Sequence, residues 1–309
     1  MPSLQRDLWL HGRRLAYHDD GEGPAVLMVH GITNSSASWR PVAERLAKSG
    51  HRVLVPDLAG HGESDRFRGD HSLGAHAAAL RDLLLAVDVE RVTVVGHSLG
   101  GGIVLQFAYQ WPEMIERIVL VDSGGLGREV SLFIRAATLP FAERVIGLGA
   151  SRPVAATAGF IGSTLGRFGV HPSPDRAEVL AGLASLGDRR RREAFVRTAR
   201  SVVSPGGQRV NATDRLYLAE DIPVLLAWGD RDPIIPVEHG REVHAQLPDS
   251  RLEIFEGSGH FPQLDDPDRF AALLADFIAT TEPVLFDRAK IRDRVLGRGA
   301  APEPGSSGR

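Results

Sequence analysis

The pentapeptide Gly-His-Ser-Leu-Gly at residues 96–100 follows the apolar run at 92–95 directly and precedes a helix-like stretch at 101–108. A serine at such a strand-to-helix turn occupies a nucleophile elbow, where a strained backbone lifts the hydroxyl off the sheet edge. Small residues are needed on both sides of the serine because bulk there would collide with the neighbouring chain. The pattern alone arises by chance roughly 0.2 times in a chain of this length. The strand before it and the helix after it therefore identify Ser98 as the candidate nucleophile.

Composition is that of a soluble enzyme and excludes several functional classes. The 309 residues are 43% hydrophobic and 24% charged, with a formal net charge of -3, so nothing indicates a nucleic-acid partner. The absence of cysteine excludes a disulfide scaffold, a thiolate nucleophile and a cysteine-ligated zinc. The polar start lacks the apolar core of a secretory signal, and no apolar run reaches the roughly 18 residues of a membrane helix. We expect a cytoplasmic protein without a membrane span, and the sequence leaves a homo-oligomer open.

Apolar runs alternate with helical patterns along most of the chain, which predicts an α/β fold with a mostly parallel central sheet flanked by helices. The alternation of strands and helices stops between residues 126 and 220, where helical periodicity continues without convincing strands. One such helical pattern runs over residues 132–148. We interpret the whole stretch at 126–220 as a helical cap inserted between two sheet strands. Residues 1–125 and 221–296 then form the core domain, and the Gly, Ser and Pro-rich tail at 297–309 is predicted to be disordered.

A serine hydroxyl is a poor nucleophile alone, so the chain must supply a base and an orienting acid. His260 lies in a glycine-punctuated loop that follows the strand ending at Phe255, on the same predicted sheet edge as Ser98. Asp232 lies in the loop after the preceding strand. The chain order Ser98, Asp232, His260 is the order of nucleophile, acid and base that accompanies the elbow.

Five ordered motifs resemble one known family, the α/β-hydrolase superfamily in its cap-bearing serine-hydrolase branch. The resemblance spans roughly residues 8 to 280. Its motifs are Val-His-Gly at 29–31, Asp-Leu-Ala-Gly-His-Gly-Glu-Ser at 57–64, Gly-His-Ser-Leu-Gly-Gly at 96–101, Gly-Asp-Arg-Asp-Pro-Ile-Ile-Pro at 229–236 and Gly-Ser-Gly-His at 257–260.

The resemblance implies a role for each matching residue. Ser98 is the nucleophile, His260 the general base and Asp232 its orienting partner. The backbone N–H groups of Leu99 and Ile32 are implied as the oxyanion hole, because in this branch the residue after the His-Gly pair donates the second N–H.

Two other carboxylates compete with Asp232. Asp122 stands at the end of the strand after the elbow helix, where a minority of the superfamily carries its acid. Asp230 would more naturally cap its loop or pair with Arg231. Glycine-flanked His260 could reach either strand end, so the sequence leaves the choice between Asp232 and Asp122 open.

No metal or cofactor site is expected. The pairs His71 with His76 and His239 with His244 are spaced i, i+5, which is about 140° around a helix and not one face. The glycines at 100–102 lack the spacing of a dinucleotide loop.

The expected activity is hydrolysis of small to medium carboxylic esters, small-molecule substrates that a serine triad cleaves through an acyl-enzyme. One alternative is a carbon–carbon hydrolase of ring-cleavage products, because Ser-Gly-Gly-Leu-Gly at 123–127 resembles a segment of those enzymes. The chain departs from that subfamily by His-Gly-Ile-Thr at 30–33 in place of a Gly-Gly-x-Gly type loop, and by His97 in place of Asn. A third hypothesis is a non-catalytic ligand receptor on the same fold.

Overall fold

The computed structural model of the chain describes residues 5–65, 69–149 and 173–296, and the tail predicted at 297–309 lies outside these ranges. Within them, no helix is both long enough and apolar enough to span a bilayer.

A central sheet in the described residues joins eight strands in the order β1-β2-β4-β3-β5-β6-β9-β10. The first three strands in this order pair antiparallel, and all later neighbours pair parallel, as the alternating pattern predicts. The strands are β1 (Gln5–Leu10), β2 (Arg13–Asp20), β3 (Ala25–Val29), β4 (Arg52–Pro56), β5 (Val92–His97), β6 (Ile115–Val121), β9 (Val224–Gly229) and β10 (Arg251–Phe255).

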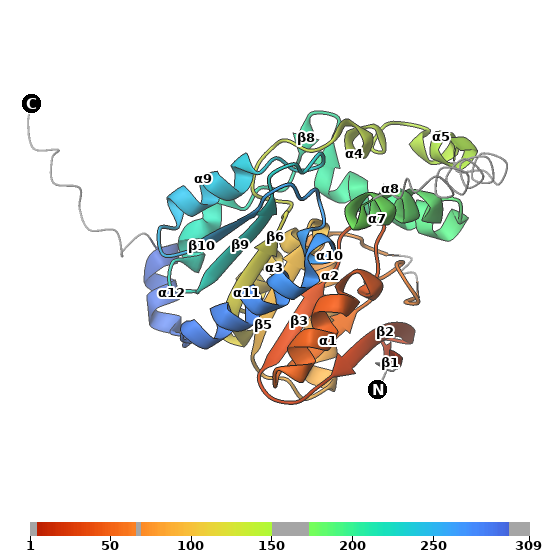
Figure 1. Cartoon of the computed structure of the whole chain (residues 1–309). Coiled ribbons are helices and arrows are strands. Elements are labelled where there is room, and N and C mark those ends of the chain that lie inside the picture. Colours follow the sequence, from red (N-terminus) through yellow and green to blue (C-terminus); the bar gives the residue numbers. More distant parts are fainter. Residues whose placement is uncertain (1–4, 66–68, 150–172, 297–309) are drawn as a thin grey trace, which may run out of the picture.

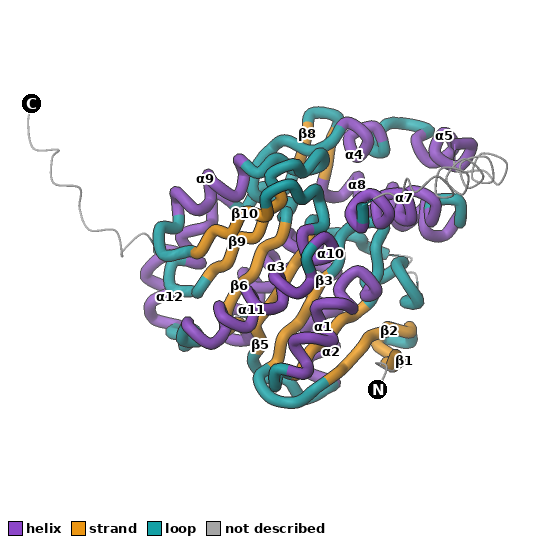
Figure 2. The backbone as a smooth tube through the Cα atoms, viewed as in Figure 1, coloured by secondary structure: helices purple, strands orange, loops and turns teal. Residues whose placement is uncertain are grey.

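Helices cover both faces of this sheet (Figures 1 and 2). The helices of the core are α1 (Arg40–Lys48), α2 (Leu73–Ala86), α3 (Leu99–Gln110), α9 (Glu238–Gln246), α10 (Pro262–Asp265), α11 (Pro267–Thr280) and α12 (Arg288–Val295). Short 3-10 helices occupy Ser36–Trp39, Pro112–Met114 and Thr213–Ala219. Apolar residues of α2, α3 and α9 pack on one face of the sheet, and those of α1 and α11 pack on the other.

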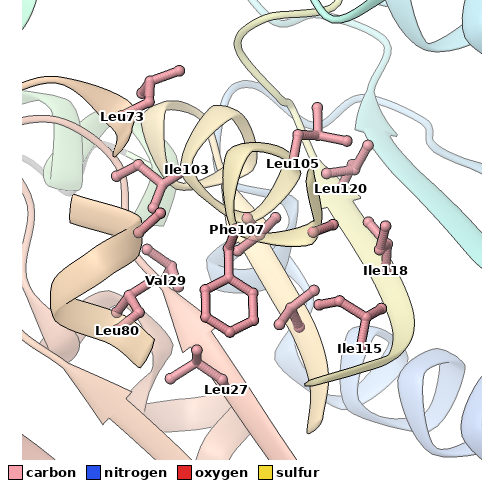
Figure 3. Packing of buried hydrophobic residues seen from close by; sticks show 14 of the residues in the cluster. Leu27, Val29, Leu73, Leu80, Ile103, Leu105, Phe107, Ile115, Ile118 and Leu120 are labelled. Atoms are coloured by element: carbon pink, nitrogen blue, oxygen red, sulfur yellow. The ribbon is translucent and has the colours of Figure 1, made fainter. Parts of the chain in front are cut away.

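The central strands β3, β5 and β9 are buried on both faces, which explains why they read as continuous apolar runs and not as alternating ones. Figure 3 shows Phe107 of α3 packed against the sheet between Leu27 of β3 and Ile115 of β6. On the opposite face, Phe270 of α11 packs against Trp39, with ring centroids 5.8 Å apart. These two layers fix the sheet and thereby the positions of the loops that leave its strands.

The stretch between β6 and β9, residues 126–220, is here called the inserted segment. Its described helices are α4 (Leu132–Ala136), α5 (Ala142–Gly149), α7 (Pro174–Ser185) and α8 (Arg189–Val202), which Figure 1 shows gathered outside the sheet at one end of the molecule. Two details differ from the sequence prediction. The helical pattern at 132–148 breaks into α4 and α5 because Pro140 lacks an N–H and Phe141 has a φ of +63°. A small hairpin, β7 (Val203–Ser204) with β8 (Gly207–Gln208), also interrupts the helices.

Candidate active site

Ser98 occupies the single position between β5 and α3, in a strained backbone conformation with φ 54° and ψ -117°. Backbone hydrogen bonds hold it there from both sides. Its N–H donates to the carbonyl of Val121 at 3.0 Å, and its own carbonyl accepts from the N–H groups of Gly101 at 3.0 Å and Gly124 at 2.9 Å. This is the backbone geometry that the sequence predicts for a nucleophile elbow.

The glycines beside Ser98 are required by close backbone approach. A Cβ atom on Gly96 would lie 2.4 Å from the carbonyl oxygen of Gly100. A Cβ atom on Gly100 would lie 2.2 Å from the carbonyl oxygen of Val29 in β3. Real Cβ atoms do not approach that closely, so the sharp turn at Ser98 depends on both glycines.

His260 and Asp232 form a hydrogen-bonded pair at the carboxyl ends of β10 and β9. His260 Nδ1 lies 2.7 Å from Asp232 Oδ2, and both side chains are almost completely buried. The other oxygen of Asp232 accepts hydrogen bonds from the N–H groups of Ile234 at 2.7 Å and Ile235 at 3.2 Å. The Asp232 carboxylate therefore accepts the Nδ1 proton of His260, which leaves Nε2 with a lone pair for use as a base.

The competing carboxylates have other contacts. Asp230 accepts a hydrogen bond from the N–H of Gly257 at 2.6 Å and so holds the loop together, as its sequence position suggests. Asp122 is fully buried and accepts from the N–H of Gly229 at 3.1 Å. Among the described residues, Asp232 is the carboxylate hydrogen-bonded to the imidazole ring of His260.

Ser98 and His260 line the same cavity, which has a volume of about 400 Å³. Ile32 and Leu99 line it as well. Leu99 is the first residue of α3, so its N–H has no partner within the helix. Ile32 lies in the turn after β3, with an N–H that makes no hydrogen bond to any described residue. Both residues thus border the cavity that contains the serine and the histidine.

The rest of the cavity wall is mostly apolar and comes from both the core and the inserted segment. Its charged group is Glu178 of α7, whose carboxyl pKa is raised by burial. The described wall contains no Lys or Arg. Residues of the inserted segment that line the cavity are Val130, Ser131, Phe133, Ile134, Glu178, Val179, Leu183, Val202, Val203, Gln208 and Val210.

Two residues that sequence reasoning did not assign to the site hold the histidine loop. His97 Nε2 donates to the main-chain carbonyl of His260 at 2.7 Å, and burial lowers the pKa of His97 well below its usual value, so the ring is neutral. Asp175, in the first turn of α7, accepts from the N–H of Phe261 at 3.0 Å. No local motif marks Asp175, because its role depends on how α7 packs against a loop 86 positions away.

The site combines three features: a strained serine between a strand and a helix, a buried histidine–aspartate pair, and an apolar cavity that the serine and the histidine share. These features point to the family that sequence comparison identifies. The family model described as "alpha/beta hydrolase fold" matches residues 24–267. The chain belongs to this family.

Three proteins show the similarity of this chain to known ones, and the names of two of them state an activity. An uncharacterized protein of Mycobacterium tuberculosis is 44% identical over 303 residues, which cover 96% of this chain and 88% of the relative. The 2-hydroxy-6-oxo-6-phenylhexa-2,4-dienoate hydrolase of Burkholderia cepacia is 28% identical over 86% of this chain and 91% of its own. The structure of a thermophilic esterase from Thermogutta terrifontis superposes with a TM-score of 0.68 at 23% identity, over 90% of this chain and 98% of the esterase chain.

The contact between Asp232 and His260 predicts that Asp232→Asn lowers turnover of an activated ester by about 10⁴, because the amide favours the wrong histidine tautomer. Asp230→Asn, in the same loop, is the matched control and should stay within about tenfold of wild type. Steady-state kinetics on p-nitrophenyl acetate measure both variants. Near-normal turnover of Asp232→Asn would contradict the assignment of the acid.

Proposed function

We propose that this α/β-hydrolase cleaves carboxylic esters of small to medium acyl chains through an acyl-enzyme on Ser98. The observation that carries the proposal is the strained Ser98 in one cavity with His260, whose Nδ1 is bound to Asp232. The other histidine of the described wall, His97, donates its Nε2 proton to a main-chain carbonyl, so the chemistry is assigned to Ser98, His260 and Asp232.

The mechanism follows from the positions of these groups. His260 Nε2 takes the proton from the Ser98 hydroxyl as the serine attacks the acyl carbon, and Asp232 stabilises the imidazolium that forms. The N–H groups of Leu99 and Ile32 stabilise the oxyanion of the tetrahedral intermediate. The alkoxide leaves with the proton from His260. Water, deprotonated by His260, then attacks the acyl-enzyme and releases the acid and the serine.

The cavity wall supports an apolar acyl group as the part of the substrate that is buried. Its volume of about 400 Å³ lies toward the low end of the range for small-molecule sites, which suits short and medium chains better than long triacylglycerols. We infer that the inserted segment acts as a cap, since it contributes 11 of the 25 lining residues.

Hydrolysis of a carbon–carbon bond in ring-cleavage products is the second candidate, and the dienoate hydrolase of Burkholderia cepacia supports it. A dienoate carries a carboxylate, and burial of an anion calls for a cationic or strongly donating partner. The described wall offers no Lys or Arg, and its one carboxyl, on Glu178, would repel such a substrate when ionised. This difference favours the ester.

A substrate panel tests the proposal directly. Wild-type enzyme should hydrolyse p-nitrophenyl esters of two to eight carbons, with values of kcat/KM at or above roughly 10⁴ M⁻¹s⁻¹ for the best chain, and should cleave a phenyl-substituted ring-cleavage dienoate at least a hundredfold less efficiently. The ratio of the two kcat/KM values is the measurement. A dienoate preference would replace the ester proposal by the second candidate, and no turnover of either would favour a ligand receptor.

A matched pair on α7 tests the proposed acyl pocket. Val179 lines the cavity, whereas its neighbour Leu180 is 58% exposed and lies outside it. Val179→Trp should fill part of the cavity and lower kcat/KM for the longest accepted ester by at least about tenfold while sparing the acetate. Leu180→Trp should leave the chain-length profile unchanged. Equal profiles for both variants would contradict the role of the inserted segment as a cap over the acyl group.

A further inference from the structure

The carboxyl of Asp122 lies beside the catalytic pair and has no role in the mechanism above. Asp122 follows β6, is 0% exposed and has a fixed backbone, because its N–H donates to the carbonyl of Ala227 at 3.1 Å. Its Oδ1 accepts one hydrogen bond, from Gly229. Its Oδ2 is completely buried, and no N–H or O–H group of the other described residues donates to it. An ionised carboxylate in this position would carry a large uncompensated cost of desolvation.

The neighbouring carboxyl of Asp232 accepts more hydrogen bonds than that of Asp122. The Asp232 carboxylate receives hydrogen bonds from two backbone N–H groups and from His260. Ligand atoms of Asp122, Asp232 and His260 all lie within 4.8 Å of one another. Two buried carboxyl groups at such a distance do not both ionise, and the proton stays on the one with fewer donors. That carboxyl is Asp122.

The electrostatic surroundings act in the same direction. Burial raises the pKa of the Asp122 carboxyl well above its usual value, and the charge of Asp232, a hydrogen bond to Asp232 and the charge of Asp175 raise it further. The N–H of Gly229 opposes these effects. The titratable groups that face Asp122 from the packed elements are Asp232, His260 and Asp175.

We propose that Asp122 is a neutral carboxylic acid whose Oδ2 proton is donated to the Asp232 carboxylate, and that it thereby positions Asp232 against His260. The inference rests on the proposed function, in which Asp232 orients the base. Asp122 does not line the cavity, so it acts through Asp232 and is a positioning residue. The hydrogen bond keeps the Asp232 carboxylate directed at Nδ1 of His260.

Two substitutions separate a neutral Asp122 from an ionised one. Asp122→Ala removes the hydrogen bonds to Gly229 and Asp232 and should lower kcat by roughly tenfold to a hundredfold with little change in KM. This is the range known for the loss of hydrogen-bond partners that orient metal ligands. Asp122→Asn keeps one acceptor for Gly229 and one donor for Asp232, so it should rescue most of that loss. The acid limb of its kcat/KM profile against pH should coincide with that of wild type.

If Asp122 is ionised, the kcat/KM profile of Asp122→Asn against pH should differ from that of wild type. Asp122→Asn would then remove a negative charge near the imidazolium and move the acid limb of the kcat/KM profile to lower pH. That shift, or an asparagine variant no more active than the alanine variant, would overturn the proposal.

Unfolding equilibria provide a readout that does not depend on any activity. The pKa of Asp122 is raised in the folded state, so the folded protein keeps this proton at pH values at which the unfolded chain has lost it. The contribution of Asp122 to stability is therefore fully present below the pKa of the unfolded state. It is lost as pH rises through the pKa of the folded state. The amide of the Asp122→Asn variant carries no such titrating proton. From about pH 5 upward, the folding equilibrium constant of wild type should therefore fall relative to that of Asp122→Asn by up to tenfold per pH unit.

Urea titrations of both proteins at about pH 5, 6, 7 and 8 measure this ratio. A ratio independent of pH would show that Asp122 is ionised in the folded protein and would overturn the proposal. The ratio of folding equilibrium constants can change with pH as expected even if the Asp232→Asn variant remains active. In that case Asp122 is neutral but the proposed triad is wrong, so failure of this proposal and failure of the proposed function give different results.

Discussion

The turn at Ser98 is the constraint on which the rest of the site depends. A residue with φ 54° between a buried strand and a helix persists only where its surroundings over-determine it. Here the carbonyl of Val121 in β6 and the N–H of Gly124 in the loop after it hold Ser98 by hydrogen bonds, and the close approach of Gly96 to Gly100 leaves no room for relaxation. The core of the fold thus holds the serine in this conformation.

The same sheet positions the other two proposed catalytic residues, Asp232 and His260. Parallel strands direct their carboxyl ends to one edge, so the loops after β9 and β10 bring Asp232 and His260 to the cavity that Ser98 borders. Secondary contacts then refine the position of the base. His97 holds the carbonyl of His260, and Asp175 ties the following N–H to α7, so the inserted segment and the histidine loop are mechanically linked.

Sequence alone predicted the parallel core, the elbow and the pair of loops because these depend on local periodicity and on glycine at fixed spacing. It left the choice between Asp122 and Asp232 open, since both follow strands and a flexible loop could reach either. It did not find Asp175 or the β7–β8 hairpin, and it read residues 132–148 as one helix despite Pro140. The first two depend on long-range packing or on two-residue strands, which leave no periodic signal. The helix break depends on Pro140, a local signal that the apolar periodicity outweighed.

The most direct test of the central claim is intact-protein and peptide mass spectrometry after reaction with a serine-directed alkyl phosphonate. The account predicts one adduct per chain on Ser98, formed at a rate that follows the ionisation of His260, and no adduct in Ser98→Ala. Ser49→Ala, which removes an exposed hydroxyl at the end of α1, should label like wild type. An adduct on another residue, or undiminished labelling of Ser98→Ala, would contradict the assignment of Ser98 as the nucleophile.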